Sequence, residues 1–166
     1  MTLVIRKQLE KIPETSIFHI NAFPQWFKFV VDFRDINAPA TSNVVTLCTL
    51  PIKAWIHALH WKVTIPFEVS WGSGTSILNF YLGDQDNKNR WVDGEPLIGT
   101  GRGGYVGLSV EDGLGIIPWE PDFDNTHDLK ADFFMDPAAG GEDLDRVVGG
   151  EITFWFLLSS MNGGVA

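Results

Sequence analysis

The chain has 166 residues, the usual length of one domain, and its 45% hydrophobic and 20% charged content excludes a disordered class. The net charge of −9 is uneven, because residues 84–166 carry five lysines and arginines against sixteen acids. Nucleic-acid binding requires a concentrated basic surface, so this distribution argues against a nucleic-acid partner. No run approaches the roughly 18 apolar residues of a membrane span, which predicts a soluble protein with no membrane partner. Seventeen glycines and nine prolines favour a turn-rich, all-β class.

The first 25 residues follow neither a helical nor a strand period. A short helix is conceivable around "VIRKQLEKI", but Pro13 and Pro24 limit it. Charges such as Arg6 and Lys7 also interrupt the apolar stretch that a secretory signal requires. We therefore expect an N-terminal arm over residues 1–25 and one β-sandwich domain over residues 26–166.

Strand periodicity begins immediately after the arm. Four apolar residues alternate on one side of a predicted strand: Phe27, Phe29, Val31 and Phe33. A second strand is predicted over residues 44–50, where Pro51 ends it. This strand contains the single cysteine, Cys48, which excludes an intrachain disulfide and predicts a small buried side chain.

The stretch "AWIHALHWKVTIPFEVSW" predicts a long strand, or a bent pair broken at Pro66. A helix over residues 52–62 is the competing interpretation. Under the strand interpretation one face holds Trp55, His57, Leu59, Trp61, Val63 and Ile65. His57 and His60 would then lie on opposite faces, which argues against a metal bound by both.

Four further strand-like stretches, residues 75–83, 103–111, 128–136 and 151–160, follow in the chain. They are separated by loops of very uneven length, and no β-α-β unit recurs. At least seven strands joined in this way predict an antiparallel sandwich.

Sequence signals for catalysis are weak. "GTGRGG" at residues 99–104 fits the dinucleotide pattern, but a strand-like segment follows it where that motif requires a helix. Ser73 lies between two glycines without the spacing of a nucleophile elbow, and Cys48 is too apolar in its surroundings to be a reactive thiolate. We therefore expect no enzymatic activity, no catalytic residue and no cofactor.

The acidic loop after residue 83 is the best candidate for a metal site. Asp84, Asp86 and Asn89 could supply oxygen ligands to calcium. Lys88 stands where an EF-hand loop would have a further oxygen ligand, and the glycine and closing glutamate of that loop are out of register. A solvated, strand-connecting turn without metal is the interpretation that we favour.

Residues 27–105, together with the final "GGEITFWFLLS", resemble small structural proteins of tailed-phage virions, of the capsid cement or decoration type. The matching motifs are the "VVTLCTLP" strand, the "VTIPF" strand end, and "LGD" followed by Arg90 and Trp91. The resemblance implies a jelly-roll-like sandwich that stabilises a capsid shell and carries no catalytic residue. It also implies location on the capsid surface, with the major capsid protein and further copies of the chain, in a dimer or trimer, as partners.

Within this hypothesis the arm is the predicted capsid or subunit interface, because it is too apolar for a free tail and its basic residues could reach an acidic neighbour. The predicted interface residues are Ile5, Arg6, Lys7, Leu9, Lys11, Ile12, Ile17, Phe18, Phe23 and Trp26. The alternative for this segment is an ordinary strand that folds back on its own domain.

A second hypothesis is a carbohydrate-binding or receptor-binding module of a head fibre, collar or tail. In that case Trp71, Trp91 and Trp119 on sandwich loops would stack on sugar rings. The acidic loop would accept hydrogen bonds from the sugar hydroxyls. Each loop tryptophan could instead close one end of the sandwich core.

Overall fold

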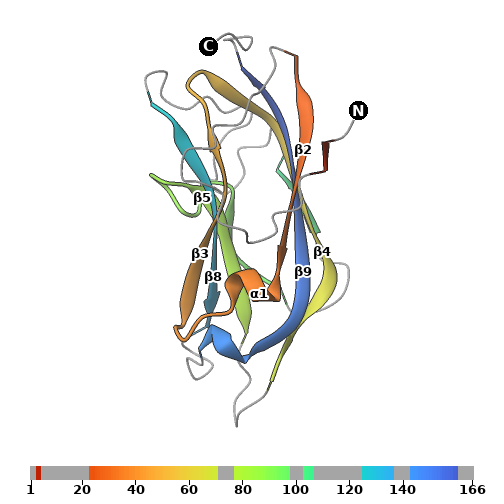
Figure 1. Cartoon of the computed structure of the whole chain (residues 1–166), viewed down its shortest axis with the longest axis vertical. Coiled ribbons are helices and arrows are strands. Elements are labelled where there is room, and N and C mark those ends of the chain that lie inside the picture. The colour runs from red at the N-terminus through yellow and green to blue at the C-terminus, as the bar shows by residue number, and fades with distance from the viewer. Residues whose placement is uncertain are drawn as a thin grey trace.

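The computed structural model describes residues 3–4, 23–70, 77–97, 103–106, 125–136 and 143–160, with only the backbone described for residues 3–4 and 103–106. These residues form two β-sheets that pack face to face (Figure 1). No helix among them is long and apolar enough to cross a membrane.

Five strands in the order β1-β2-β9-β4-β7 form the first sheet, called sheet A here. Their bounds are Leu3–Val4 for β1, Gln25–Asp32 for β2, Ala54–Val69 for β4, Gly103–Val106 for β7 and Val147–Ser160 for β9. Four strands in the order β3-β8-β5-β6 form sheet B. Their bounds are Ser42–Leu50 for β3, Leu78–Asp84 for β5, Val92–Pro96 for β6 and His127–Met135 for β8.

The strand pairing is that of a hairpin rolled into two layers. β2 pairs antiparallel with β9, β3 with β8, β4 with β7 and β5 with β6. Strands far apart in sequence thus lie side by side, and from β2 to β9 the chain changes sheet at every step except between β5 and β6, which is the connectivity of a jelly roll. The predicted all-β, jelly-roll-like sandwich is confirmed.

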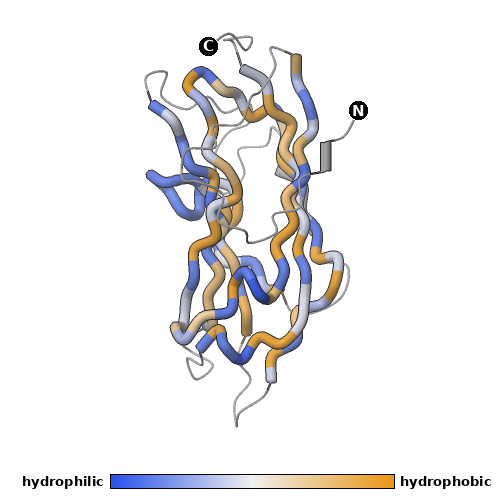
Figure 2. The backbone as a smooth tube through the Cα atoms, viewed as in Figure 1, coloured by the Kyte–Doolittle hydropathy of each residue, from blue (hydrophilic) through white to orange (hydrophobic). Residues whose placement is uncertain are grey.

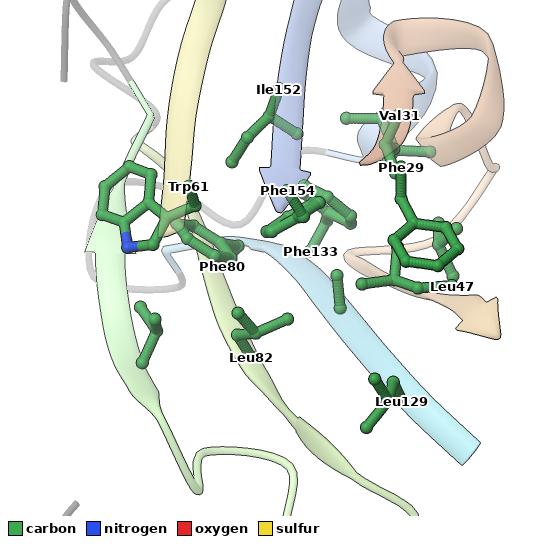
Figure 3. Close-up of a cluster of buried hydrophobic side chains, with 14 of the residues drawn as sticks. Phe29, Val31, Leu47, Trp61, Phe80, Leu82, Leu129, Phe133, Ile152 and Phe154 are labelled. Atoms are coloured by element: carbon green, nitrogen blue, oxygen red, sulfur yellow. The ribbon is translucent and has the colours of Figure 1, made fainter. Parts of the chain in front are cut away.

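Aromatic side chains from both sheets interlock in the core. Trp61 on β4 meets Phe80 on β5 edge-to-face, with ring centroids 5.0 Å apart, and Phe80 also lies against Phe133 and Phe154 (Figure 3). Phe80, Phe133 and Phe154 are fully buried. Burying each such ring contributes on the order of 2–3 kcal/mol, so this cluster holds the two layers together.

The first predicted strand is one residue too long at its C-terminal end. β2 buries Phe27, Phe29 and Val31 as expected, but Phe33 begins the four-residue helix α1, Phe33–Ile36. The cause is a capping box, in which Asp32 accepts a hydrogen bond from an N–H of the first turn and Asp35 accepts one from the N–H of Asp32. Phe33 is therefore only packed against the core rather than part of the strand's buried face.

β4 confirms a continuous strand through Pro66 and excludes the helical alternative. Its predicted faces are wrong, because a bulge at His57 shifts the register between Ile56 and Ala58. Ahead of the bulge Ile56 faces the core, and after it Leu59 and Trp61 do. A strict two-residue alternation along β4 would place Ile56 on the face opposite to Leu59 and Trp61, so it could not predict that all three face the core.

Besides α1, two further short elements were not predicted. β6 forms an edge strand within the stretch assigned to the acidic loop, and the 3₁₀ turn η3, Leu144–Arg146, leads into β9. The remaining predicted strands correspond to β5, β7, β8 and β9, with ends shifted by a few residues.

The predicted arm is described only in part. Leu3 and Val4 pair in parallel with Phe27 and Lys28, so β1 adds an edge strand to sheet A of its own domain. Two predicted interface residues are described: Phe23 is 81% exposed, and Trp26 on β2 is 37% exposed. Eight others lie outside the described residues: Ile5, Arg6, Lys7, Leu9, Lys11, Ile12, Ile17 and Phe18.

Candidate functional site

The acidic loop between β5 and β6 is organised around Asp84. Asp84 is 2% exposed, and its carboxylate accepts hydrogen bonds from the backbone N–H groups of Asp86 and Asn87, at 2.9 and 2.7 Å. The guanidinium of Arg90 forms an ion pair with the same carboxylate. Asp84 therefore caps the turn, and the hydrophilic loop in Figure 2 is anchored by one buried ion pair.

These hydrogen bonds use the carboxylate oxygens that Asp84 would need to bind a metal ion. Both carboxylate oxygens already accept hydrogen bonds, and Asn89 donates from its amide to Asp93. Asp86 instead lies 3.5 Å from Nδ1 of the buried His127. In the parts of the chain that the structure describes, no three histidine, cysteine, aspartate or glutamate residues are grouped to hold an ion.

Trp91 is not a platform for a sugar. It is 1% exposed and belongs to the core, and its backbone N–H donates a hydrogen bond to the carbonyl of Leu82 on β5. The loop tryptophan thus closes the sandwich, and this part of the glycan hypothesis is wrong. Trp71 and Trp119 lie outside the described residues.

The glycine-rich pattern does not open a helix. Gly103 and Gly104 start the strand β7, so the amide dipoles of a helix N-terminus are not presented there. Cys48 is buried, as predicted. Ser73 lies outside the described residues.

Both histidines of β4 lie on the outer face of sheet A, contrary to the predicted opposite faces. The bulge at His57 is the cause. His57 bonds Ser159 through Nε2 at 2.6 Å and stacks on Trp55, while His60 packs against Trp155 on β9 with centroids 5.0 Å apart.

The His57–Ser159 pair has the contact of a nucleophile and its base but lacks a third group. Among the described residues no carboxylate lies within 4.0 Å of a His57 ring nitrogen. A catalytic histidine is normally oriented by such a group. The pair is therefore best explained as a hydrogen bond between neighbouring strands.

The outer face of sheet A is rich in tryptophan and lysine. The register places Trp26 beside Leu157, Lys28 beside Trp155, and Lys62 beside Thr153. The Lys28 ammonium lies 5.9 Å from the Trp155 ring centroid. At the centre Thr153 is fully buried although its side chain points away from the core, and among the described residues its hydroxyl has no hydrogen-bond partner.

The outer face of sheet B is different, because its cations have partners. Lys88 lies 3.8 Å from Asp132 and 4.4 Å from the centre of the Tyr81 ring, which stacks on Phe134. Lys130 lies 3.7 Å from Asp128. Burial raises the pKa of the Asp132 carboxyl, and the nearby Lys88 ammonium offsets that rise only in part.

With the fold and surfaces described, the chain can be compared with known proteins. No family model and no curated protein matches it. Two solved structures do. A chain of the capsid of Ralstonia phage GP4 has 11% identity and a TM-score of 0.50, over 99% of this chain and 100% of that one. A chain of the cyanophage Pam1 capsid asymmetric unit has 12% identity and a TM-score of 0.49, over 81% and 83%.

The GP4 chain shares this fold. At 11% identity the likeness concerns the arrangement of strands, and both chains are spanned almost completely. The order of strands described above is thus found in a second protein of similar extent.

The aromatic face of sheet A was not predicted as a site. Trp155 was assigned only to a final strand, and Lys28 only to the outward side of the first. The available signal was the position of Trp155 in β9 between two phenylalanines, Phe154 and Phe156, which both face inward. A tryptophan that points outward from a central strand is the kind of side chain that is enriched at protein–protein contacts.

Proposed function

We propose that this chain is a non-enzymatic structural protein of a phage virion, which binds the major capsid protein at the capsid surface as a cement or decoration protein. The observation that carries the proposal is the rolled-hairpin strand order, matched over 99% of the chain by a chain of the Ralstonia phage GP4 capsid. The resemblance of the strand motifs to small virion proteins points the same way.

The surfaces of the molecule are compatible with this role. A cement protein stabilises a shell by mass action, since it binds the assembled form and not the separated subunits. Such binding uses broad contact areas rather than a catalytic cleft. The partly exposed tryptophans on sheet A are suited to such contacts.

We further propose that the chain acts as a symmetric oligomer, a dimer or a trimer, and that the N-terminal arm contributes to its contacts. Phe23 supports a contact role, because a phenylalanine ring that is 81% exposed gains by being covered.

The test is to delete the gene from its source phage and heat the purified particles. Particles without the chain should release DNA at a lower temperature, and adding the purified chain should restore the wild-type temperature. Mass spectrometry of wild-type virions supplies the control for presence of the chain. The proposal fails if the chain is absent from virions, or if its removal leaves the release temperature unchanged.

A further inference from the structure

We infer that two copies of this chain associate through the outer faces of their A sheets, in a two-fold arrangement with the central β9 strands antiparallel. The inference deepens the proposed function, on whose oligomer it rests, because it names the surface through which copies meet. It is argued from unpaired charges, from the order of residues along β9, and from the fit of large side chains to small ones.

Unpaired charges of both signs occur on this face. Among the residues that the structure describes, no carboxylate lies within 4.0 Å of the ammonium of Lys28 or Lys62. Within the described part of the chain, Glu151 on β9 has no cation within that distance and bonds only the Thr64 hydroxyl, at 2.6 Å. Glu68 at the exposed end of β4 likewise has no ion-pair partner among those residues. The face therefore has cations and anions that the described residues do not neutralise.

The strand register separates these charges along one direction. Lys28 and His60 lie level with Trp155, and Lys62 lies level with Thr153. Glu68 lies level with Gly149 at the other end of the face, beyond Glu151 itself. The Trp155 and Gly149 levels are six residues apart on β9, or about 20 Å in a strand. One end of the face is thus cationic and aromatic, and the other is acidic.

A two-fold axis that crosses β9 near Ile152 brings opposite ends together. It reverses the strand direction, so the Thr153 level of one copy faces the Glu151 level of the other. Lys62 then approaches the carboxylate of Glu151 in the second copy, and the His60 ring comes within reach of a hydrogen bond with that copy's Glu68. Both contacts are made twice, which is the property of an isologous interface.

Side-chain sizes match in the same arrangement. The Trp155 level faces the Gly149 level of the second copy, and Gly149 has no side chain to obstruct an indole ring. Covering Trp155, which is only partly buried, removes apolar surface from water. Aromatic residues that fill pockets at the centre of an interface usually contribute most of its binding energy.

Solution mass measured by light scattering tests the inference on the purified full chain. The wild-type protein should have twice the mass of one 18.5 kDa chain and dissociate on dilution. Lys62→Glu and Glu151→Lys should each weaken association about tenfold or more. The double variant, Lys62→Glu with Glu151→Lys, should regain association, because its charges are again opposite across the two-fold axis.

The control is Lys130→Glu on the outer face of sheet B, which should leave the mass unchanged. Lys62 is exposed, so its replacement should also leave the circular dichroism spectrum unchanged. A monomer at all concentrations, a trimer, or a dimer indifferent to the charge reversals would overturn the inference. A monomer that is nevertheless present in virions removes only this interface, whereas a dimer absent from virions removes only the proposed function.

Discussion

The outer faces of the two sheets each carry two lysines but place them in different surroundings. On sheet B, Lys88 and Lys130 lie 3.8 and 3.7 Å from aspartates of the same chain. On sheet A, Lys28 and Lys62 have no such partner among the described residues. The two lysines of sheet B are thus paired with carboxylates of the same molecule. The two lysines of sheet A, and the tryptophan rings beside them, are available for contacts with a second molecule.

The largest loss of stability is expected from a substitution at Gly83, where strand β5 leads into the acidic loop. A methyl group added to Gly83 would lie 2.0 Å from the carbonyl oxygen of Asn87, which is backbone and cannot rotate away. Gly83→Ala should lower the free energy of unfolding by more than about 3 kcal/mol, measured by urea denaturation. On sheet A, Gly149→Ala is the control at a protein concentration low enough to dissociate the proposed dimer, because its added methyl lies 3.6 Å from the nearest atom. Equal stability of the two variants would contradict this explanation of Gly83.

The second prediction separates a buried tryptophan from an outward one. Trp91→Ala should cost about 3–5 kcal/mol of unfolding free energy, because it leaves a large cavity beneath sheet B. Trp155→Ala should cost less than half as much, since solvent already reaches its ring. Denaturation of the two variants at one protein concentration checks the order, and a reversed order would show that Trp155 belongs to the core.

The third prediction concerns the ion pair that holds the acidic loop. Asp84→Asn keeps the size of the side chain but leaves the Arg90 guanidinium without its carboxylate. We expect a loss of about 2–3 kcal/mol, measured by thermal and urea unfolding. Asp86→Asn is the matched control in the same loop, and its exposed carboxylate should matter little. Comparable losses in both variants would refute the assigned role of Asp84.

The smallest expected effect is a pH dependence on the outer face of sheet B. Burial raises the pKa of Asp132, and one of its buried carboxylate oxygens has no hydrogen-bond partner among the described residues. The protonated form therefore favours the fold, and this contribution is lost as the pH rises above the ordinary value of 3.8. Asp132→Asn should be slightly more stable than wild type at pH 7, with a difference that shrinks towards pH 3. A wild type that is more stable at pH 7 would mean that the Lys88 pair outweighs burial.

The fold could largely be predicted because the buried residues follow strand periodicity. Alternation in β2 identified the strand and its inward face without knowledge of its partner, and β8 was predicted as a strand although no face was assigned to it. Local chemistry set the limits: the capping box at Asp32 ended a strand that hydrophobicity alone would extend, and the bulge at His57 moved two histidines to one face. A bulge adds one residue without a distinctive sequence, so periodicity cannot locate it.

The candidate site was much harder to predict. Lys28, Lys62 and Trp155 come from three strands, and they become neighbours only through a register that sequence periodicity does not contain. The burial of Trp91 depends likewise on the path of the acidic loop, which Asp84 fixes through its hydrogen bonds. Residue types indicated which side chains are able to bind, while the topology decides which of them meet.

The central position of β9 has a consequence for how the protein is made. β9 is the last strand that the structure describes, yet it lies between β2 and β4 and pairs with both. On a ribosome that synthesises the chain from its N-terminus, β2 and β4 emerge long before the strand that joins them. Until β9 has been synthesised, β2 and β4 lack the strand that pairs with both of them. Sheet A therefore assembles only after nearly the whole described chain has been synthesised. Chaperone protection during that interval will matter most for the edges of these two strands, and a ribosome stalled before residue 147 will carry a sheet that cannot close.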